Sequence, residues 1–258
     1  MQLKVIKIGG NIIENETALE AFLTDFATIE GPKILVHGGG KLATQLAEKL
    51  GIETQMVEGR RITDAETLKV IIMVYGGFAN KTIVAKLQAK DCNAIGLSGA
   101  DGNAITAVKR PVKTIDYGFV GDIESVNSKT ISALLESGLT PVFCAISHDG
   151  NGQLFNTNAD TIASTIATGM SSLYDVALYY CFEKNGVMKD INDDDSVIEH
   201  INAENYQKLL DDKIIIDGMI PKLHNAFEAL KQNVSKVCIG NTKMILEKEG
   251  AKHTTITL

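Results

Sequence analysis

Two apolar runs that end in glycines decide the fold of this chain: Val5-Ile6-Lys7-Ile8-Gly9-Gly10 and Ile34-Leu35-Val36-His37-Gly38-Gly39-Gly40. Each run is typical of a short buried strand, and each is followed by a helical pattern, over residues 16–28 and 42–50. The alternation continues, with further strands expected at 94–97, 141–146 and 176–181, and further helices at 64–75, 79–90, 128–136 and 161–170. Short alternating strands at 104–126 predict a β-hairpin. Continuous apolar strands between helices predict an α/β fold whose mainly parallel sheet is covered on both faces.

A short Gly/Ser stretch at residues 169–175 is the best candidate for a boundary between two parts of the chain. It stands between an expected helix and an expected strand. We therefore expect two lobes, residues 1–173 and residues 174–258. The length of 258 residues suits two compact lobes as well as one large domain.

Composition and charge exclude several classes of function. Lys and Arg number 25 against 32 Asp and Glu, for a formal net charge of −7, so the chain lacks the basic footprint of a nucleic-acid binder. No apolar run approaches the roughly 20 residues that span a bilayer. The first residues run straight into a strand pattern, so no secretory signal is expected. The four cysteines form no CxxC pair, which disfavours a structural zinc site. We expect a cytoplasmic enzyme or small-molecule binding module, without nucleic-acid or membrane partners.

The two glycine turns are candidates for one shared anion site. Lys7 lies in an apolar strand directly before Gly9 and Gly10, and its ammonium must reach solvent or an anion. Glycines let backbone amides approach a ligand closely, and free amides at a helix start bind anions. The spacing matches neither G-x-x-x-x-G-K-[ST] nor G-x-G-x-x-G. The alternative is an edge-strand lysine followed by an ordinary tight turn.

Three further motifs place polar residues between a strand or turn and a helix. In Asn156–Asp160, Asn158 could simply be an N-cap and Asp160 a favourable first-turn residue, which leaves Asn156 unexplained. In Asp217–Lys222, Lys222 is expected just inside a helix, where it could be an ordinary solvated charge. Arg61 offers a two-pronged donor for a carboxylate, or it could only balance the charge of Asp64.

Six motifs occur in order along the chain: residues 5–10, 37–40, 59–64, 96–102, 156–160 and 217–222. Together they resemble the amino acid kinase superfamily, and within it the acylglutamate kinases, over residues 4–239. The resemblance implies a three-layer α/β/α sandwich with an N-terminal acceptor lobe, which also dimerises, and a C-terminal nucleotide lobe. It implies ATP-dependent phosphorylation of the side-chain carboxylate of N-acetylglutamate in arginine biosynthesis. The alternatives are another N-acylglutamate, such as N-succinylglutamate, or a non-catalytic ligand sensor.

The resemblance also implies roles for single residues. Lys7 and Lys222 would stabilise the transferring phosphoryl group, with Asp160 keeping both amines aimed. The acceptor would be held by Gly39, Gly40, Arg61, Asn156 and Asn158. The nucleotide would be held by Gly9, Gly10, Glu183, Asn185, Gly186, Val187, Ile215 and Ile216. Mg²⁺ is expected to enter bound to ATP, without dedicated protein ligands.

The chain departs from the family pattern at three places. Glu183 stands where the family usually has the Asp of an Asp-Val-x-Gly turn, which affects expected contacts with the nucleotide. Lys41 follows the glycines where a small residue or Pro is common. The N-terminal helical extension of arginine-inhibited members is lacking, so we expect a homodimer without arginine feedback.

Overall fold

The structure is a computed structural model, and it describes the chain except for residues 58–59, 191, 216–218 and 248–250. Its elements, in chain order, are β1 (Gln2–Ile8), α1 (Gly10–Glu14), α2 (Glu16–Ala27), β2 (Lys33–His37), α3 (Gly40–Lys49), β3 (Met56–Val57), β4 (Arg60–Arg61), α4 (Ala65–Ile71), the π-helical segment η1 (Ile72–Ala79), α5 (Asn80–Gln88), β5 (Ala94–Leu97), the 3₁₀ turn η2 (Asp101–Asn103), β6 (Ile105–Lys109) and β7 (Gly121–Val126). They continue with α6 (Ser128–Glu136), β8 (Thr140–Cys144), β9 (Ile146–His148), β10 (Leu154–Asn156), α7 (Ala159–Met170), β11 (Asp175–Cys181), β12 (His200–Ile201), α8 (Ala203–Asp211), α9 (Ile220–Lys231), β13 (Lys236–Gly240), the 3₁₀ turn η3 (Thr242–Leu246) and β14 (Thr254–Ile256).

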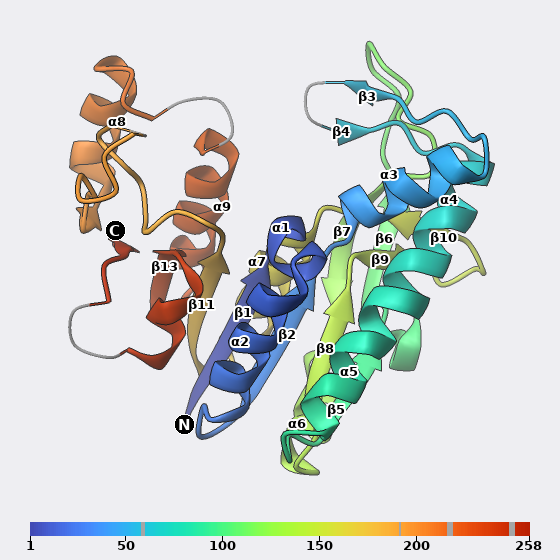
Figure 1. Ribbon diagram of the computed structural model, residues 1–258, viewed down its shortest axis with the longest axis horizontal. Coiled ribbons are helices and arrows are strands. Elements are labelled where there is room, and N and C mark those ends of the chain that lie inside the picture. The colour runs from blue at the N-terminus through green and yellow to red at the C-terminus, as the bar shows by residue number, and fades with distance from the viewer. Residues whose placement is uncertain (58–59, 191, 216–218, 248–250) are drawn as a thin grey trace.

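Among the described residues, eight strands form one sheet in the order β12-β14-β13-β11-β1-β2-β8-β5. Its neighbours pair in parallel except for β13 and β14. The predicted α/β fold with a mainly parallel sheet is therefore confirmed. The sheet runs through the predicted boundary between lobes, because β11 pairs with β1 along its whole length. Figure 1 shows β1 and β2 near its middle.

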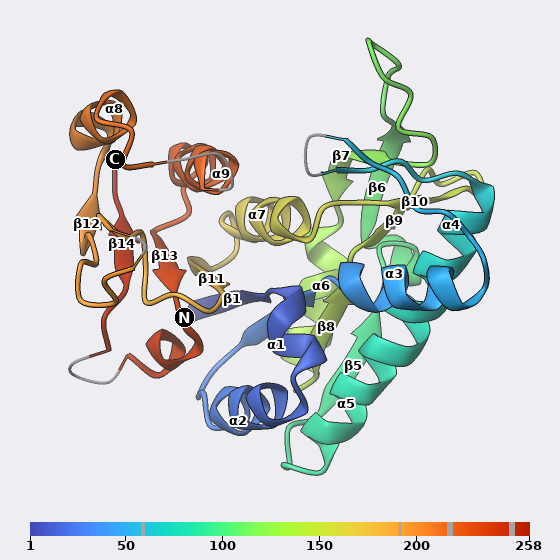
Figure 2. The same ribbon diagram turned by 45° about the horizontal axis from the view of Figure 1, so that its top comes forward.

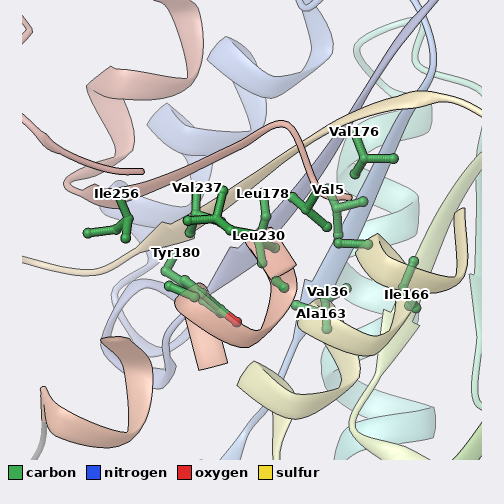
Figure 3. Packing of buried hydrophobic residues seen from close by; sticks show 14 of the residues in the cluster. Val5, Val36, Ala163, Ile166, Val176, Leu178, Tyr180, Leu230, Val237 and Ile256 are labelled. Atoms are coloured by element: carbon green, nitrogen blue, oxygen red, sulfur yellow. The ribbon is translucent and has the colours of Figure 1, made fainter. Parts of the chain in front are cut away.

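Helices cover both faces of this sheet, as three layers require. On one face, α1, α2, α5 and η3 pack against Ile6, Ile8 and Tyr179. On the other face, α6, α7 and α9 pack against Leu3, Val5 and their neighbours. Figure 2 shows α7 and α9 on the opposite side of the strands from α2. Figure 3 shows the second face from close by, with apolar side chains of adjacent strands meeting the helices.

A smaller sheet extends the N-terminal part beyond the main one. Its order is β10-β9-β6-β7, and the antiparallel pair β6–β7 is the hairpin that the sequence predicts at residues 104–126. The two-residue strands β3 and β4 pair nearby (Figure 1). This extension matters for the site because β4 carries Arg61 and β10 ends at Asn156.

The helices expected at residues 64–75 and 79–90 are one continuous helix of 24 residues, Ala65–Gln88, whose middle is π-helical. By length and composition alone this helix could span a membrane. Its buried side chains instead pack into the core beneath the sheet, as Ile71, Ile83 and Leu87 do. Lys81 and Lys86 also interrupt its apolar run. These features are those of a core helix.

Candidate active site

Lys7 points to one face of the sheet because side chains alternate along a strand. Leu3 and Val5, on the same face of β1, pack in the core beside α7. Lys7 therefore also faces α7, near the carboxyl end of its strand. In open α/β sheets, ligands bind outside the carboxyl ends of the strands, so Lys7 occupies the position of a ligand-contacting residue.

Asp160, in the first turn of α7, joins two lysines that are distant in sequence. The Lys7 Nζ atom lies 2.7 Å from its Oδ1 atom, and the Lys222 Nζ atom donates a hydrogen bond to Oδ2. Burial alone would raise the pKa of Asp160, but the two ammonium groups outweigh burial and lower this pKa to about 2. Burial also lowers the pKa of Lys222, against the attraction of Asp160. Two cations and one buried anion leave a net positive site.

The start of α7 is fixed by local hydrogen bonds. The Asn158 side chain accepts hydrogen bonds from the backbone amides of Asp160 and Thr161, at 2.8 and 3.1 Å, and is therefore the N-cap. The Tyr180 hydroxyl donates to the backbone carbonyl of Asp160 at 3.2 Å. Capping explains the position of Asn158; its expected contact with the acceptor stays a prediction.

The second glycine turn is built so that its carbonyls face the protein. The Gly39 carbonyl accepts from the Ala43 amide at 2.9 Å, and the Gly40 carbonyl accepts from Arg61 Nη2 and Thr44 Oγ1, each at 3.0 Å. Gly39 has a φ of +156°, and a Cβ there would lie 3.0 Å from the Tyr75 ring. Only glycine fits this backbone without strain.

One terminal nitrogen of the Arg61 guanidinium is hydrogen-bonded within the protein, and the other is buried without a partner among the described residues. Its Nη2 atom donates to Gly40 and Thr44, whereas Nη1 is buried and makes no hydrogen bond within the described residues. A buried donor without a partner is costly, and it is expected where a ligand completes the site. The Asn156 side chain donates to Thr63 Oγ1 at 3.0 Å, and Thr63 donates to the Arg61 carbonyl at 3.3 Å. The structure thus connects Asn156 to the segment that carries Arg61.

The first glycine turn differs in detail from the expectation that both its amides face a ligand. The Gly9 amide donates to the Cys181 carbonyl at 3.2 Å. Gly10 begins α1, whose first-turn amides have no partner within the helix. Lys41 reaches across to α1, where it donates to the Asn11 side chain and lies 3.7 Å from a Glu14 carboxylate oxygen. The two glycine turns are therefore adjacent in space.

The expected nucleotide residues of the C-terminal part lie in loops at the carboxyl end of β11. Glu183 is exposed, and the Asn185 side chain accepts a hydrogen bond from Asn241 at 2.6 Å. Gly186 is buried, with Thr254 Oγ1 2.6 Å from where a Cβ would stand. Val187 and Ile215 are buried in the core that covers the α7 face. Ile216, Asp217 and Gly218 lie outside the described residues.

Three residues that hold this site are missing from the candidates that the sequence suggests: Thr44, Thr63 and Tyr75. Thr63 belongs to the motif at residues 59–64, so the motif itself is a signal for this residue. For Tyr75 the sequence predicts only that it lies in a helix, because its contact with Gly39 arises only in the folded protein. Within the described part of the chain, no group of three or more His, Cys, Asp or Glu side chains could hold a metal ion.

These features define a phosphotransferase class of site: two glycine turns and Lys7 at the carboxyl ends of parallel strands, with Lys222 brought to the same site from the first turn of α9. Residues 2–241 match the family model described as "Amino acid kinase family", and the chain belongs to this family. It is 57% identical to the acetylglutamate kinase of Phocaeicola vulgatus, over 96% of this chain and 97% of that protein. It is 55% identical to the acetylglutamate kinase of Bacteroides thetaiotaomicron, over 97% and 98%.

The solved structures support the same fold. The carbamate kinase from Giardia lamblia bound to AMP-PNP superposes with a TM-score of 0.71, covering 98% of this chain and 97% of that chain. Its sequence identity is 14%, so this likeness concerns the fold alone. The resemblance to amino acid kinases that the motifs suggested is confirmed by the family match and by the curated relatives.

Proposed function

We propose that the chain phosphorylates the side-chain carboxylate of N-acetylglutamate with ATP, as a step of arginine biosynthesis. The carboxylate oxygen attacks the γ-phosphorus, the bond to the β–γ bridging oxygen breaks, and ADP leaves with an acyl phosphate formed. The observation that carries this proposal is the Lys7–Asp160–Lys222 cluster beside two glycine turns, in a chain more than half identical to acetylglutamate kinases. The relatives' names favour acetyl over a longer acyl group, and the intact cluster disfavours a non-catalytic sensor.

Charge, rather than proton transfer, is the main demand of this reaction. A side-chain carboxylate has a pKa near 4.3 and is already ionised at neutral pH, so no general base is required. The obstacle is repulsion between the anionic nucleophile and the phosphates, which fixed positive charge and positioning reduce. Lys7 and Lys222 supply that charge, and Asp160 holds both ammonium groups in place.

The acceptor site in this proposal is the Gly38–Gly40 turn with Arg61. The partnerless Nη1 atom of Arg61 binds the α-carboxylate, while the amides of Gly39 and Gly40 bind the acceptor. Asn156 and Asn158 line the same region. The nucleotide contacts Gly10 and the loops after β11, where Glu183, Asn185 and Gly186 lie, so residues 1–173 act as the acceptor lobe and 174–258 as the nucleotide lobe.

We also propose that Mg²⁺ enters as part of MgATP. The one carboxylate at the centre of the described site, Asp160, is already committed to two lysines. Mg²⁺ commonly keeps several waters and is held through substrate phosphates. A cytoplasmic location and a homodimer complete the proposal. In favour of a dimer, the helix Ala65–Gln88 exposes Met73 (51% exposed) and Phe78 (64% exposed) about one turn apart.

Trapping of the acyl phosphate tests the reaction. Purified protein is incubated with MgATP, hydroxylamine and one acceptor at a time: N-acetylglutamate, N-succinylglutamate, carbamate or a nucleoside monophosphate. We expect hydroxamate with N-acetylglutamate and ADP in equal amount, and none when ATP is omitted. Turnover with carbamate or a nucleotide in place of every N-acylglutamate would refute the proposal and favour another kinase of the family.

A further inference from the structure

His37, the last residue of β2, is fully buried directly before the glycine turn, and phosphoryl transfer does not need its acid–base chemistry. Both nitrogens of its ring have partners. Nδ1 lies 2.7 Å from the Gly38 carbonyl oxygen, and Nε2 lies 3.0 Å from the Asn80 side-chain nitrogen. Burial lowers the pKa of His37 to about 4, so the ring is neutral near pH 7.

The position of the proton on this ring follows from a third partner. The Asn80 side-chain nitrogen also lies 2.9 Å from the Val142 carbonyl oxygen. A carbonyl can only accept, so the Asn80 atom facing it must be the NH₂ group. The same NH₂ group faces His37 Nε2, which must therefore accept. The single proton of the neutral ring is then on Nδ1, and Nδ1 donates to the Gly38 carbonyl.

This hydrogen bond determines the direction of a backbone amide. In a trans peptide the carbonyl of one residue and the N–H of the next point in opposite directions. With the Gly38 carbonyl held toward His37, the Gly39 N–H points away from the buried ring. Within the described residues this N–H makes no hydrogen bond. The Gly39 and Gly40 carbonyls are held by Ala43 and Arg61, so all three carbonyls of the turn are fixed.

We propose that His37, oriented by Asn80, is a positioning residue that aims the Gly39 amide at the bound acceptor. The inference rests on the proposed function, because it takes the anionic ligand of this glycine turn to be an N-acylglutamate. His37 touches neither substrate; it acts through the Gly38 peptide. Its loss lets the Gly38–Gly39 peptide rotate, which weakens acceptor binding while MgATP binding is retained.

The tautomer can be measured without any enzyme activity. Long-range ¹H–¹⁵N correlation spectra of the ¹⁵N-labelled protein, assigned with the His37→Asn variant, distinguish a protonated Nδ1 from a protonated Nε2. We expect a neutral ring protonated at Nδ1 at pH 7. A ring protonated at Nε2 would overturn the proposal, because it could not donate to Gly38.

Two substitutions separate positioning from packing. His37→Leu removes both ring nitrogens, whereas His37→Asn places an amide nitrogen as many bonds from Cβ as Nδ1 and can still donate to Gly38. For His37→Leu we expect Kd and KM for N-acetylglutamate to rise roughly tenfold, with KM for MgATP changed less than about twofold. For His37→Asn we expect acceptor affinity within about threefold of wild type. Isothermal titration calorimetry gives Kd, and steady-state kinetics gives the two KM values.

Lys33→Met is the matched control, because Lys33 is a buried polar residue on the same strand, at its other end. It is expected to destabilise the protein without changing acceptor affinity. Unchanged acceptor affinity in His37→Leu, or equal losses in His37→Leu and Lys33→Met, would overturn the positioning role. Failure of the wild type to bind N-acetylglutamate would instead refute the proposed function, while the tautomer measurement would still stand.

Discussion

Asp160 lies between the ammonium groups of Lys7 and Lys222. Its motif predicts a helix start, and helix-start acids are common for reasons that involve no ligand. Only the packing of α7 against β1, and of α9 against α7, brings Lys7 and Lys222 to its two oxygens. The same is true of Arg61, whose free Nη1 atom depends on the contacts that Gly40 and Thr44 make with Nη2.

Lys222→Ala is expected to lower kcat about 10²-fold to 10³-fold with little change in the acceptor KM. The reason is that its charge matters most when negative charge is spread over the transferring phosphoryl group. Steady-state kinetics with both substrates varied measures this split. Lys231→Ala, an exposed lysine at the other end of α9, is the control and should keep wild-type kcat. A rise in acceptor KM with unchanged kcat would contradict the assigned role.

Arg61→Ala should raise the acceptor KM about tenfold to a hundredfold, with a smaller effect on kcat. A hydrogen bond to a charged group contributes on the order of 1.5–3 kcal/mol, and the partnerless Nη1 atom is the donor available for it. Arg60→Ala is a matched control, because the exposed Arg60 is its neighbour on β4. An unchanged acceptor KM in Arg61→Ala would refute the role of Arg61.

Acid stability tests the charge state of Asp160. Its pKa is lowered to about 2 from a usual 3.8, so the unfolded chain binds the proton more readily. The stabilisation that its ionised form gives is therefore complete above pH 3.8 and is lost as the pH falls toward 2. Urea unfolding of wild type and Asp160→Asn at several pH values should show a difference in unfolding free energy that shrinks in this window. A constant difference would argue against an ionised Asp160.

At the scale of elements, the spacing of apolar residues and the positions of glycines predict strands and helices well where one face is clearly apolar. The pattern of residues 128–136 predicts a helix, and α6 covers the same range. The expected break between residues 75 and 79, which contains Gly76 and Gly77, is instead bridged by the π-helical segment η1. Glycine weakens a helix by only about 1 kcal/mol, and tertiary packing overrides this cost. β3 and β4 are each two residues long, too short to show an alternation of apolar and polar residues.

Lys33 joins two elements, β2 and α2, and gives a prediction at this scale. Its ammonium donates to the carbonyls of Phe26, Ala27 and Ile29 at 2.7–2.9 Å, at the carboxyl end of α2. Lys33→Met keeps the volume but leaves three carbonyls without this donor, at a cost on the order of 2 kcal/mol. Urea unfolding should show this loss, with kinetic constants close to wild type. Wild-type stability would mean that water replaces the ammonium at no cost.

At the scale of the whole molecule, parallel topology explains why motifs that are distant in the sequence lie together. β2, β1 and β11 are adjacent and parallel, so the turns that follow all three leave the same edge of the sheet. That places Gly9, Gly39 and Gly186 on one side. The sequence cannot predict the hydrogen bonds that link Val142 to Asn80 and Asn80 to His37. These residues come from three elements, and only the folded protein brings them into contact.

We expect the helix Ala65–Gln88 to form the interface of the proposed homodimer. Burying Met73 and Phe78 against a second copy removes apolar surface from water, which is favourable at roughly 25 cal/mol per Å². Phe78→Asp would place a charge in that interface, and we expect it to shift the protein from dimer to monomer in analytical ultracentrifugation. Val112→Asp is the control, since Val112 is 59% exposed but lies outside this helix. A wild-type monomer at micromolar concentration, or an unaltered dimer in Phe78→Asp, would contradict an interface on this helix.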